Sequence, residues 1–152
     1  MPGPQSETSL VEREVRVEAP PERVFPYFTD PEKMVRLIGV GATLDPRPGG
    51  VFWVDTKSDY FFEGKYVAIE PHSRIVFTWG YERELFAMPP QSTAVEVSLT
   101  PTGNETVVRL AHRALPETAT DFHRAGWDHY LPRLATAAAG GDPGPDPLSR
   151  TA

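Results

Sequence analysis

The segment that most restricts the fold of this chain lies near its C-terminus, at residues 116–139. It opens with Pro-Glu-Thr and is followed by Gly140-Gly141, which are typical signals for the start and the end of a helix. Apolar and small residues recur within it at steps of three and four, which places them on one helix face: Phe122, Gly126, Trp127, Tyr130, Leu131 and Leu134. We expect Arg124, Asp128 and Arg133 mostly on the other face. Such a helix needs an apolar surface to cover.

Nearly all of the chain before this helix predicts short strands. Alternating polar and apolar residues, bounded by turn residues, predict strands at 8–18, 42–47, 51–57, 60–70, 74–81, 93–100 and 106–114. Two small helices are expected between the first two strands, at 21–29 and 30–38, and Pro26 should distort the first of them. Strands joined by tight turns indicate an antiparallel meander, so the chain is predicted to be an α+β domain with the long helix on its sheet.

Composition narrows the possible functions. A chain of 152 residues with 39% hydrophobic and 24% charged residues is typical of one globular domain, which we place at 8–139 between disordered ends at 1–7 and 140–152. The net charge of −6 argues against nucleic acid. No apolar run is long enough for a membrane span, and the absence of cysteine excludes disulfides and thiolate metal sites. We expect a cytoplasmic protein with no cofactor and no metal.

Several short motifs resemble those of a known superfamily. The stretches APPERVF at 19–25 and TDPEKM at 29–34 resemble the helix-entry motifs of the SRPBCC, or START-like, superfamily. DPRPGG at 45–50 is similar to its Gly-Gly turn, and Gly126-Trp127 with the leucines that follow is similar to its C-terminal helix motif. The resemblance covers about residues 11–138. It is strongest to homologues of the activator of the heat-shock-protein-90 ATPase, next to polyketide cyclase-like proteins.

This resemblance implies a helix-grip fold, in which a curved antiparallel sheet wraps around the long C-terminal helix. In the superfamily, the space between sheet and helix often holds a lipid, a sterol, a polyketide or another apolar molecule. One difference weakens the transfer of a ligand preference. Many relatives carry a tryptophan before the glycine that ends the second small helix, where this chain has Leu37-Ile38-Gly39.

Aromatic residues are the main candidates for lining such a cavity. The candidate set has twelve members: Trp53, Tyr60, Phe61, Phe62, Tyr66, Phe77, Trp79, Tyr81, Phe86, Phe122, Trp127 and Tyr130. By themselves they are equally compatible with a fully packed core, and the resemblance favours a cavity. We expect eight residues to line it and to bind a ligand: Trp53, Tyr66, Phe77, Trp79, His112, His123, Trp127 and Tyr130.

Polar candidates for chemistry are few, and each has a plain structural alternative. His123 lies four residues before Trp127 and so shares its helix face, whereas His112 could point to either side of the last strand. Asp55 shares a strand face with Trp53 and would act as a base if that face is inward; otherwise it meets water at a strand end. Arg13 falls on the apolar side of the first strand, where it either reaches water at an edge or faces a ligand.

Three functions remain open from the sequence. The first is the binding of a small hydrophobic or aromatic molecule in an internal cavity. The second is a polyketide cyclase- or dehydrase-like enzyme, in which His123, His112 or Asp55 moves protons, although no catalytic signature such as Gly-x-Ser-x-Gly is present. The third is an interaction with a protein partner, like that of the chaperone ATPase activators.

Overall fold

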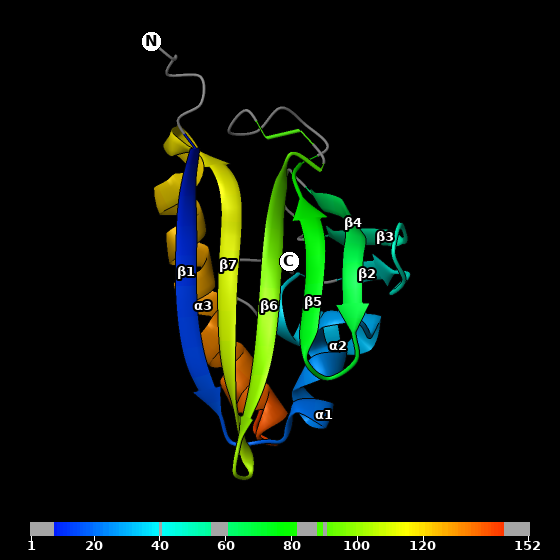
Figure 1. The fold of residues 1–152 in the computed structure, drawn as a ribbon, viewed down its shortest axis with the longest axis vertical. Helices are drawn as coiled ribbons and strands as arrows, with labels where there is room; N and C mark the ends of the chain where they lie inside the picture. Colours follow the sequence, from blue (N-terminus) through cyan, green and yellow to red (C-terminus); the bar gives the residue numbers. More distant parts are fainter. Residues whose placement is uncertain (1–7, 40, 56–60, 82–87, 90, 145–152) are drawn as a thin grey trace.

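The strands form one antiparallel sheet in the order β1-β7-β6-β5-β4-β3-β2 (Figure 1). The computed structural model describes residues 8–39, 41–55, 61–81, 88–89 and 91–144. After the crossover from β1, each strand pairs with the next along the chain, and β7 closes the series against β1. The bounds are β1 (Thr8–Val17), β2 (Gly41–Leu44), β3 (Val51–Asp55), β4 (Phe61–Glu70), β5 (Arg74–Trp79), β6 (Thr93–Thr102) and β7 (Glu105–Pro116). The predicted meander is confirmed.

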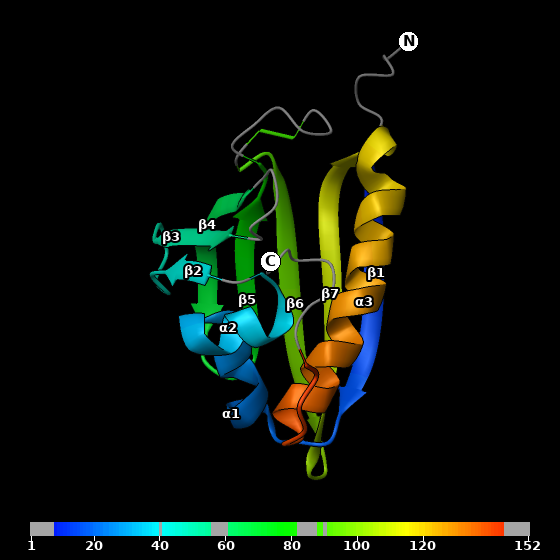
Figure 2. The ribbon, with the colours of Figure 1, turned by 180° about the vertical axis from the view of Figure 1, so that it is seen from behind.

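The helices lie on one face of this sheet, as the view from behind shows (Figure 2). They are α1 (Pro21–Val24), η2 (Phe25–Phe28), α2 (Pro31–Leu37), η3 (Glu117–Ala119) and α3 (Thr120–Ala138). Pro26 falls within the tighter 3-10 turn η2, which confirms the expected distortion of the first small helix. The Asp30 side chain accepts a hydrogen bond from the backbone N–H of Glu32 and caps α2. The α+β helix-grip fold is therefore confirmed.

The core lies between the sheet and α3. In β5 the residues alternate between half-buried and buried, and Ile75, Phe77 and Trp79 form its buried side. The same alternation continues in β6 with Val95 and Val97. Because successive strand residues point to opposite faces, this pattern shows that one face of the sheet is covered by helices and the other faces water.

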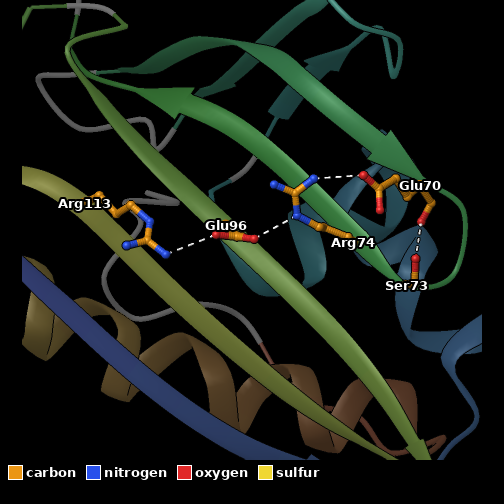
Figure 3. Close-up of polar contacts among 5 residues, drawn as sticks. All are labelled: Glu70, Ser73, Arg74, Glu96 and Arg113. Carbon is orange, nitrogen blue, oxygen red and sulfur yellow. Dashed lines mark hydrogen bonds and ion pairs between the residues drawn. The ribbon is translucent and has the colours of Figure 1, made fainter.

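The outer face carries a row of ion pairs that crosses four strands (Figure 3). Glu96 on β6 lies 2.8 Å from Arg74 on β5 and 3.2 Å from Arg113 on β7, and Arg74 also pairs with Glu70 at the end of β4. The hydrogen bond from Arg74, more than that from Arg113, lowers the pKa of the Glu96 carboxyl. Exposed pairs of this kind stabilise a fold only slightly, but they mark this face as solvated.

Two residues of α3 lie differently from the prediction based on helix periodicity. Phe122, expected on the covered face, is 44% exposed at the start of the helix, and Arg133, expected on the polar face, is only 8% exposed. The Arg133 guanidinium donates to the carbonyls of Arg36 and Leu37 at the end of α2, and to those of Pro143 and Gly144 beyond α3. A long side chain with five donors can thus be buried wherever carbonyls without helix partners converge.

Part of the predicted C-terminal tail packs against the domain. Residues 140–144 were predicted to belong to a disordered tail, but they are described and supply two of the carbonyls bound by Arg133. Residues 1–7 and 145–152 lie outside the described residues. Within the described part, we find no helix with the length and apolar character needed to cross a bilayer. The cytoplasmic location stays a prediction.

Candidate functional site

A cavity of about 230 Å³ lies between the first half of α3 and the strands β4 and β5. It is partly open to the outside, and its wall is mainly apolar. Its lining residues are Phe62, Trp79, Tyr81, Phe122, His123, Ala125, Gly126, Trp127 and Tyr130. An uncharged wall with a few polar atoms is typical of a small-molecule site.

Two small residues in α3 leave room for this cavity. Ala125 and Gly126 lie between the bulky side chains of His123 and Trp127. A β-carbon added at Gly126 would meet nothing closer than Tyr130 Cε2, at 3.8 Å. The helix surface at this level therefore leaves open space, whereas nearer the C-terminus of α3 the large residues Leu131 and Leu134 are buried.

The end of the cavity farthest from α2 contains a buried tyrosine–histidine pair. Tyr81 Oη lies 2.5 Å from His123 Nε2, and His123 Nδ1 lies 2.8 Å from the carbonyl oxygen of Ala119. A carbonyl can only accept, so Nδ1 of the neutral imidazole carries the proton and Nε2 accepts the hydrogen of the Tyr81 hydroxyl. This pairing joins the strand side of the wall to the helix side.

A second hydrogen-bond chain lies behind the wall and fixes its position. The indole N–H of Trp127 donates to His112 Nδ1 at 3.0 Å, so the neutral His112 carries its proton on Nε2. That nitrogen lies 2.9 Å from the Thr93 hydroxyl, which donates in turn to the Trp79 carbonyl at 2.7 Å. The chain connects α3 through β7 and β6 to β5, so the Trp127 ring is held in a fixed position relative to the β5 backbone at Trp79.

Burial keeps both of these histidines neutral. It lowers the pKa of His112 well below the usual value of 6.5, and the neighbouring His123 lowers this pKa further. Burial also lowers the pKa of His123, and the hydrogen bond to Ala119 offsets only part of that effect. The two imidazole rings contact each other edge to face, with centroids 5.3 Å apart, so protonating one would disfavour protonating the other.

These shifts predict that the protein loses stability in mild acid. Unfolded histidines take up protons below about pH 6.5, whereas the buried pair in the folded protein does not. The free energy of unfolding should therefore be constant above pH 7 and fall as the pH drops from about 6.5 towards 5, by about 1.4 kcal/mol per pH unit for each histidine that stays neutral. Urea denaturation at a series of pH values measures this slope.

The control for this experiment is His72, an exposed residue of the β4–β5 turn with a φ of 68°. We expect His72→Asn to fold normally, because asparagine also tolerates this backbone conformation. We expect His123→Gln to reduce the slope. An unfolding free energy that is the same at pH 5 and pH 7 would contradict the assignment of two buried neutral histidines.

Four of the eight residues predicted to line a cavity do so: Trp79, His123, Trp127 and Tyr130. Phe77 borders a second cavity of only about 10 Å³ behind the first, which is barely the space of one water molecule. His112 lies behind the wall, where it binds Trp127. Tyr66 is in the core, where its hydroxyl donates to the Phe28 carbonyl at 2.7 Å and burial raises the pKa of the phenol.

The expected inward face of β3 is the outward one. Phe52 and Val54 are fully buried, whereas Trp53 and Asp55 lie half-buried on the opposite face. This places Trp53 outside the cavity, and it removes the condition under which Asp55 was a candidate base. The alternation itself was correct, but alternation does not reveal which of two faces is covered.

Arg13 forms an ion pair and does not belong to the lining of the candidate site. Its guanidinium donates to the carboxylate of Asp128 on α3, with Nε 2.6 Å from Oδ1. The hydrogen bond from Arg13 lowers the pKa of the Asp128 carboxyl. The arginine therefore connects the edge strand β1 to the exposed side of the helix. This agrees better with the predicted edge position than with the alternative of an arginine that faces a ligand.

Some parts of the wall were not assigned from the sequence. Phe62 and Tyr81 belonged to the aromatic set but not to the predicted lining. The signal for the open space was the pair of small residues Ala125 and Gly126 in the middle of the helix. Tyr60 and Phe86 lie outside the described residues. Among the residues that the structure describes, no group of three or more His, Asp or Glu side chains could hold a metal ion.

Comparison with known proteins agrees with this fold. The family model of Activator of Hsp90 ATPase homolog 1-like proteins matches residues 18–139. The chain is 39% identical to an AHSA1-like protein of Rhizobium etli, with a TM-score of 0.73 and coverage of 96% of this chain and 91% of that one. No curated protein matches the sequence.

Two further solved structures, CalU16 and DynU16, are similar to this chain. CalU16 of Micromonospora echinospora is 26% identical over 91% of this chain and 86% of its own, with a TM-score of 0.70. DynU16, a protein of the dynemicin biosynthetic locus, is 25% identical over 88% of this chain, with a TM-score of 0.75. The chain spans about half, 48%, of DynU16. From the family match and the Rhizobium structure, the chain belongs to the Activator of Hsp90 ATPase homolog 1-like family of the SRPBCC superfamily.

Proposed function

We propose that this protein binds a small hydrophobic or aromatic molecule in the cavity between its sheet and α3. The observation that carries the proposal is the cavity of about 230 Å³ with its aromatic wall. Apolar surface of this kind gains free energy when a ligand replaces the water around it. The family match and the structural similarity to CalU16 and to DynU16, a protein of a biosynthetic locus, support a ligand-binding role for this fold.

The cavity volume sets the size of a suitable probe. A cavity of about 150 Å³ in another protein binds benzene, so about 230 Å³ has room for a second fused ring. Naphthalene is therefore a suitable first probe. Trp79 and Trp127 line the cavity and Trp53 does not, so binding should change the fluorescence of a Trp53→Phe variant, in which both remaining tryptophans report on the site.

A larger side chain at Gly126 should fill the cavity and weaken ligand binding. We expect Gly126→Leu to reduce naphthalene affinity at least tenfold, because the new side chain grows from a lining position where a β-carbon has space. Gly126→Ala adds only a methyl group and should retain most of the affinity. Both variants should fold, since replacing a mid-helix glycine by alanine stabilises a helix by about 0.5–1 kcal/mol. Fluorescence titration and calorimetry measure the two affinities.

Two results would count against a binding role for the cavity. If wild type and Gly126→Ala fail to bind naphthalene, and the protein purified from its own host carries no small molecule by native mass spectrometry, the cavity has no binding role. If Gly126→Leu binds as tightly as wild type, the probe occupies another place.

A cyclase-like enzyme is the second candidate, and the Tyr81–His123 pair is the observation that favours it. The phenol and the imidazole are hydrogen-bonded at the cavity wall, where together they could pass a proton to or from a ligand. The lowered pKa of His123 makes it a weak base, and the described lining includes no carboxylate. Turnover that His123→Gln abolishes without loss of binding would establish this alternative.

An interaction like that of the chaperone activators has less support. The large exposed hydrophobic residues in the described part of the chain are Leu10, Val51, Val67 and Phe122. They belong to four different elements, β1, β3, β4 and α3, so the fold does not collect them on one strand or helix as a docking surface.

A further inference from the structure

The indole of Trp79 has an unsatisfied hydrogen-bond donor. Trp79 is 2% exposed and lines the cavity, yet its Nε1–H is buried without a hydrogen-bond partner. Most buried donors in proteins are paired, and an unpaired one raises the free energy of the folded state. The other buried polar side-chain atom without a partner among the described residues is Glu63 Oε1, which belongs to a half-buried residue outside the cavity lining.

Other polar groups at this wall already bind one another. The Tyr81 hydroxyl is used by His123, and His123 Nδ1 is used by Ala119. The indole N–H of Trp127 is used by His112. Trp79 Nε1 is thus the buried donor at the wall whose partner must come from outside the protein.

The Trp79 ring lies between other aromatic rings and borders the cavity. It stacks on Phe62 with a centroid distance of 4.2 Å and lies 5.4 Å from the Trp127 ring. Trp79 also borders the larger cavity and the small apolar one behind it. Because the larger cavity borders the ring, a small tilt of the indole into that space would bring its N–H within reach of a ligand atom.

We propose that the ligand of this cavity is a neutral aromatic molecule with one hydrogen-bond acceptor, such as a carbonyl oxygen, that accepts from Trp79 Nε1–H. This rests on the proposed binding function and specifies its ligand class. A ligand of this kind satisfies the unpaired donor, whereas a pure hydrocarbon leaves it unpaired. A site built around a polar group discriminates strongly against ligands that lack its complement.

The same wall disfavours charged ligands. Its lining residues, as far as the structure describes them, include no lysine, arginine, aspartate or glutamate, and burial lowers the pKa of His123 so that this residue stays neutral. An anion would therefore be buried without a counter-charge, which is costly. One neutral donor suits a ketone, an ether or a ring nitrogen.

A matched pair of probes tests the inference. Acetylnaphthalene and isopropenylnaphthalene, substituted at the same ring carbon, have nearly the same shape, but only the first has an acceptor oxygen. We expect wild-type protein to bind the ketone about tenfold more tightly, which corresponds to about 1.4 kcal/mol. In Trp79→Phe this preference should disappear, because phenylalanine keeps an aromatic ring and removes the N–H. Trp53→Phe is the matched control and should keep it.

A spectroscopic measurement separates a direct hydrogen bond from a change of packing. The indole ¹H–¹⁵N signal of Trp79, identified by its absence in Trp79→Phe, should move downfield with the ketone and much less with the alkene. Equal affinity of wild type for both probes would overturn the inference while leaving the binding function intact. Binding of neither probe would overturn both the inference and the binding function. A preference for the ketone that survives in Trp79→Phe would also overturn the inference, because another group of the protein would then donate the hydrogen bond.

Discussion

Gly64→Ala is expected to lower the free energy of unfolding by about 3 kcal/mol or more, at the upper end of overpacking effects. Gly64 is buried in β4, where a β-carbon would lie 1.9 Å from the Thr78 carbonyl oxygen and 2.4 Å from its carbon. These are backbone atoms of the adjacent strand, so the clash cannot be relieved by rotating a side chain. The two strands would have to separate. Urea denaturation of the purified variant measures the effect.

The close approach of β4 to β5 at Gly64 lies next to two residues that line the cavity. Here the backbone N–H of Lys65 donates to the Thr78 hydroxyl instead of to a carbonyl, and the regular pairing of β4 with β5 gives way to an isolated bridge between Phe62 and Tyr81. Glycine permits this tight contact. Both residues of the bridge line the cavity, so Gly64→Ala should also weaken ligand binding.

Gly41→Ala is the matched control for this effect. Gly41 also lies in a strand, β2, but a β-carbon there would be 3.9 Å from its nearest neighbour, Asp55 Cβ. Its unfolding free energy should stay within about 1 kcal/mol of wild type. If Gly64→Ala were equally mild, the approach between β4 and β5 would be looser than described.

Arg133→Met should have the second largest effect, a loss of about 3 kcal/mol. The Arg133 guanidinium donates to four backbone carbonyls at 2.8–3.1 Å, and hydrogen bonds to a charged group each contribute about 1.5–3 kcal/mol, offset by the cost of burying the charge. Methionine fills much of the volume but leaves the carbonyls at the end of α2 without this donor. Denaturant unfolding measures the loss, and hydrogen exchange near residues 36–37 and 143–144 should accelerate.

Arg36→Met provides the comparison for Arg133. Arg36 is exposed on α2, so removing its side chain should change stability by less than about 0.5 kcal/mol. Arg133→Lys should fall between the two, because lysine keeps the charge but cannot reach both segments with a planar fork. A stable Arg133→Met protein with unchanged exchange would show that the carbonyls find other partners.

Local sequence patterns were sufficient to predict the main elements of the fold. The Asp30-Pro31 pair marks the start of α2 because the aspartate accepts from a backbone N–H that the helix cannot use. Turn residues on either side of 74–81 predicted the strand β5, and the helical spacing of His123, Trp127 and Tyr130 predicted one wall of the cavity. These predictions depend only on residues a few positions apart.

The sequence by itself therefore determined the order of strands and helices, the helix face that carries Trp127 and Tyr130, and the expectation of an aromatic space beneath it. Tertiary structure decided which face of β3 is inward, since Phe52 and Trp53 are equally apolar candidates. It also decided that Arg133 is buried and that Tyr81 meets His123, 42 residues away. The physical reason is that periodicity describes one element, whereas hydrogen-bond partners and open space arise only when elements distant in the chain are brought together.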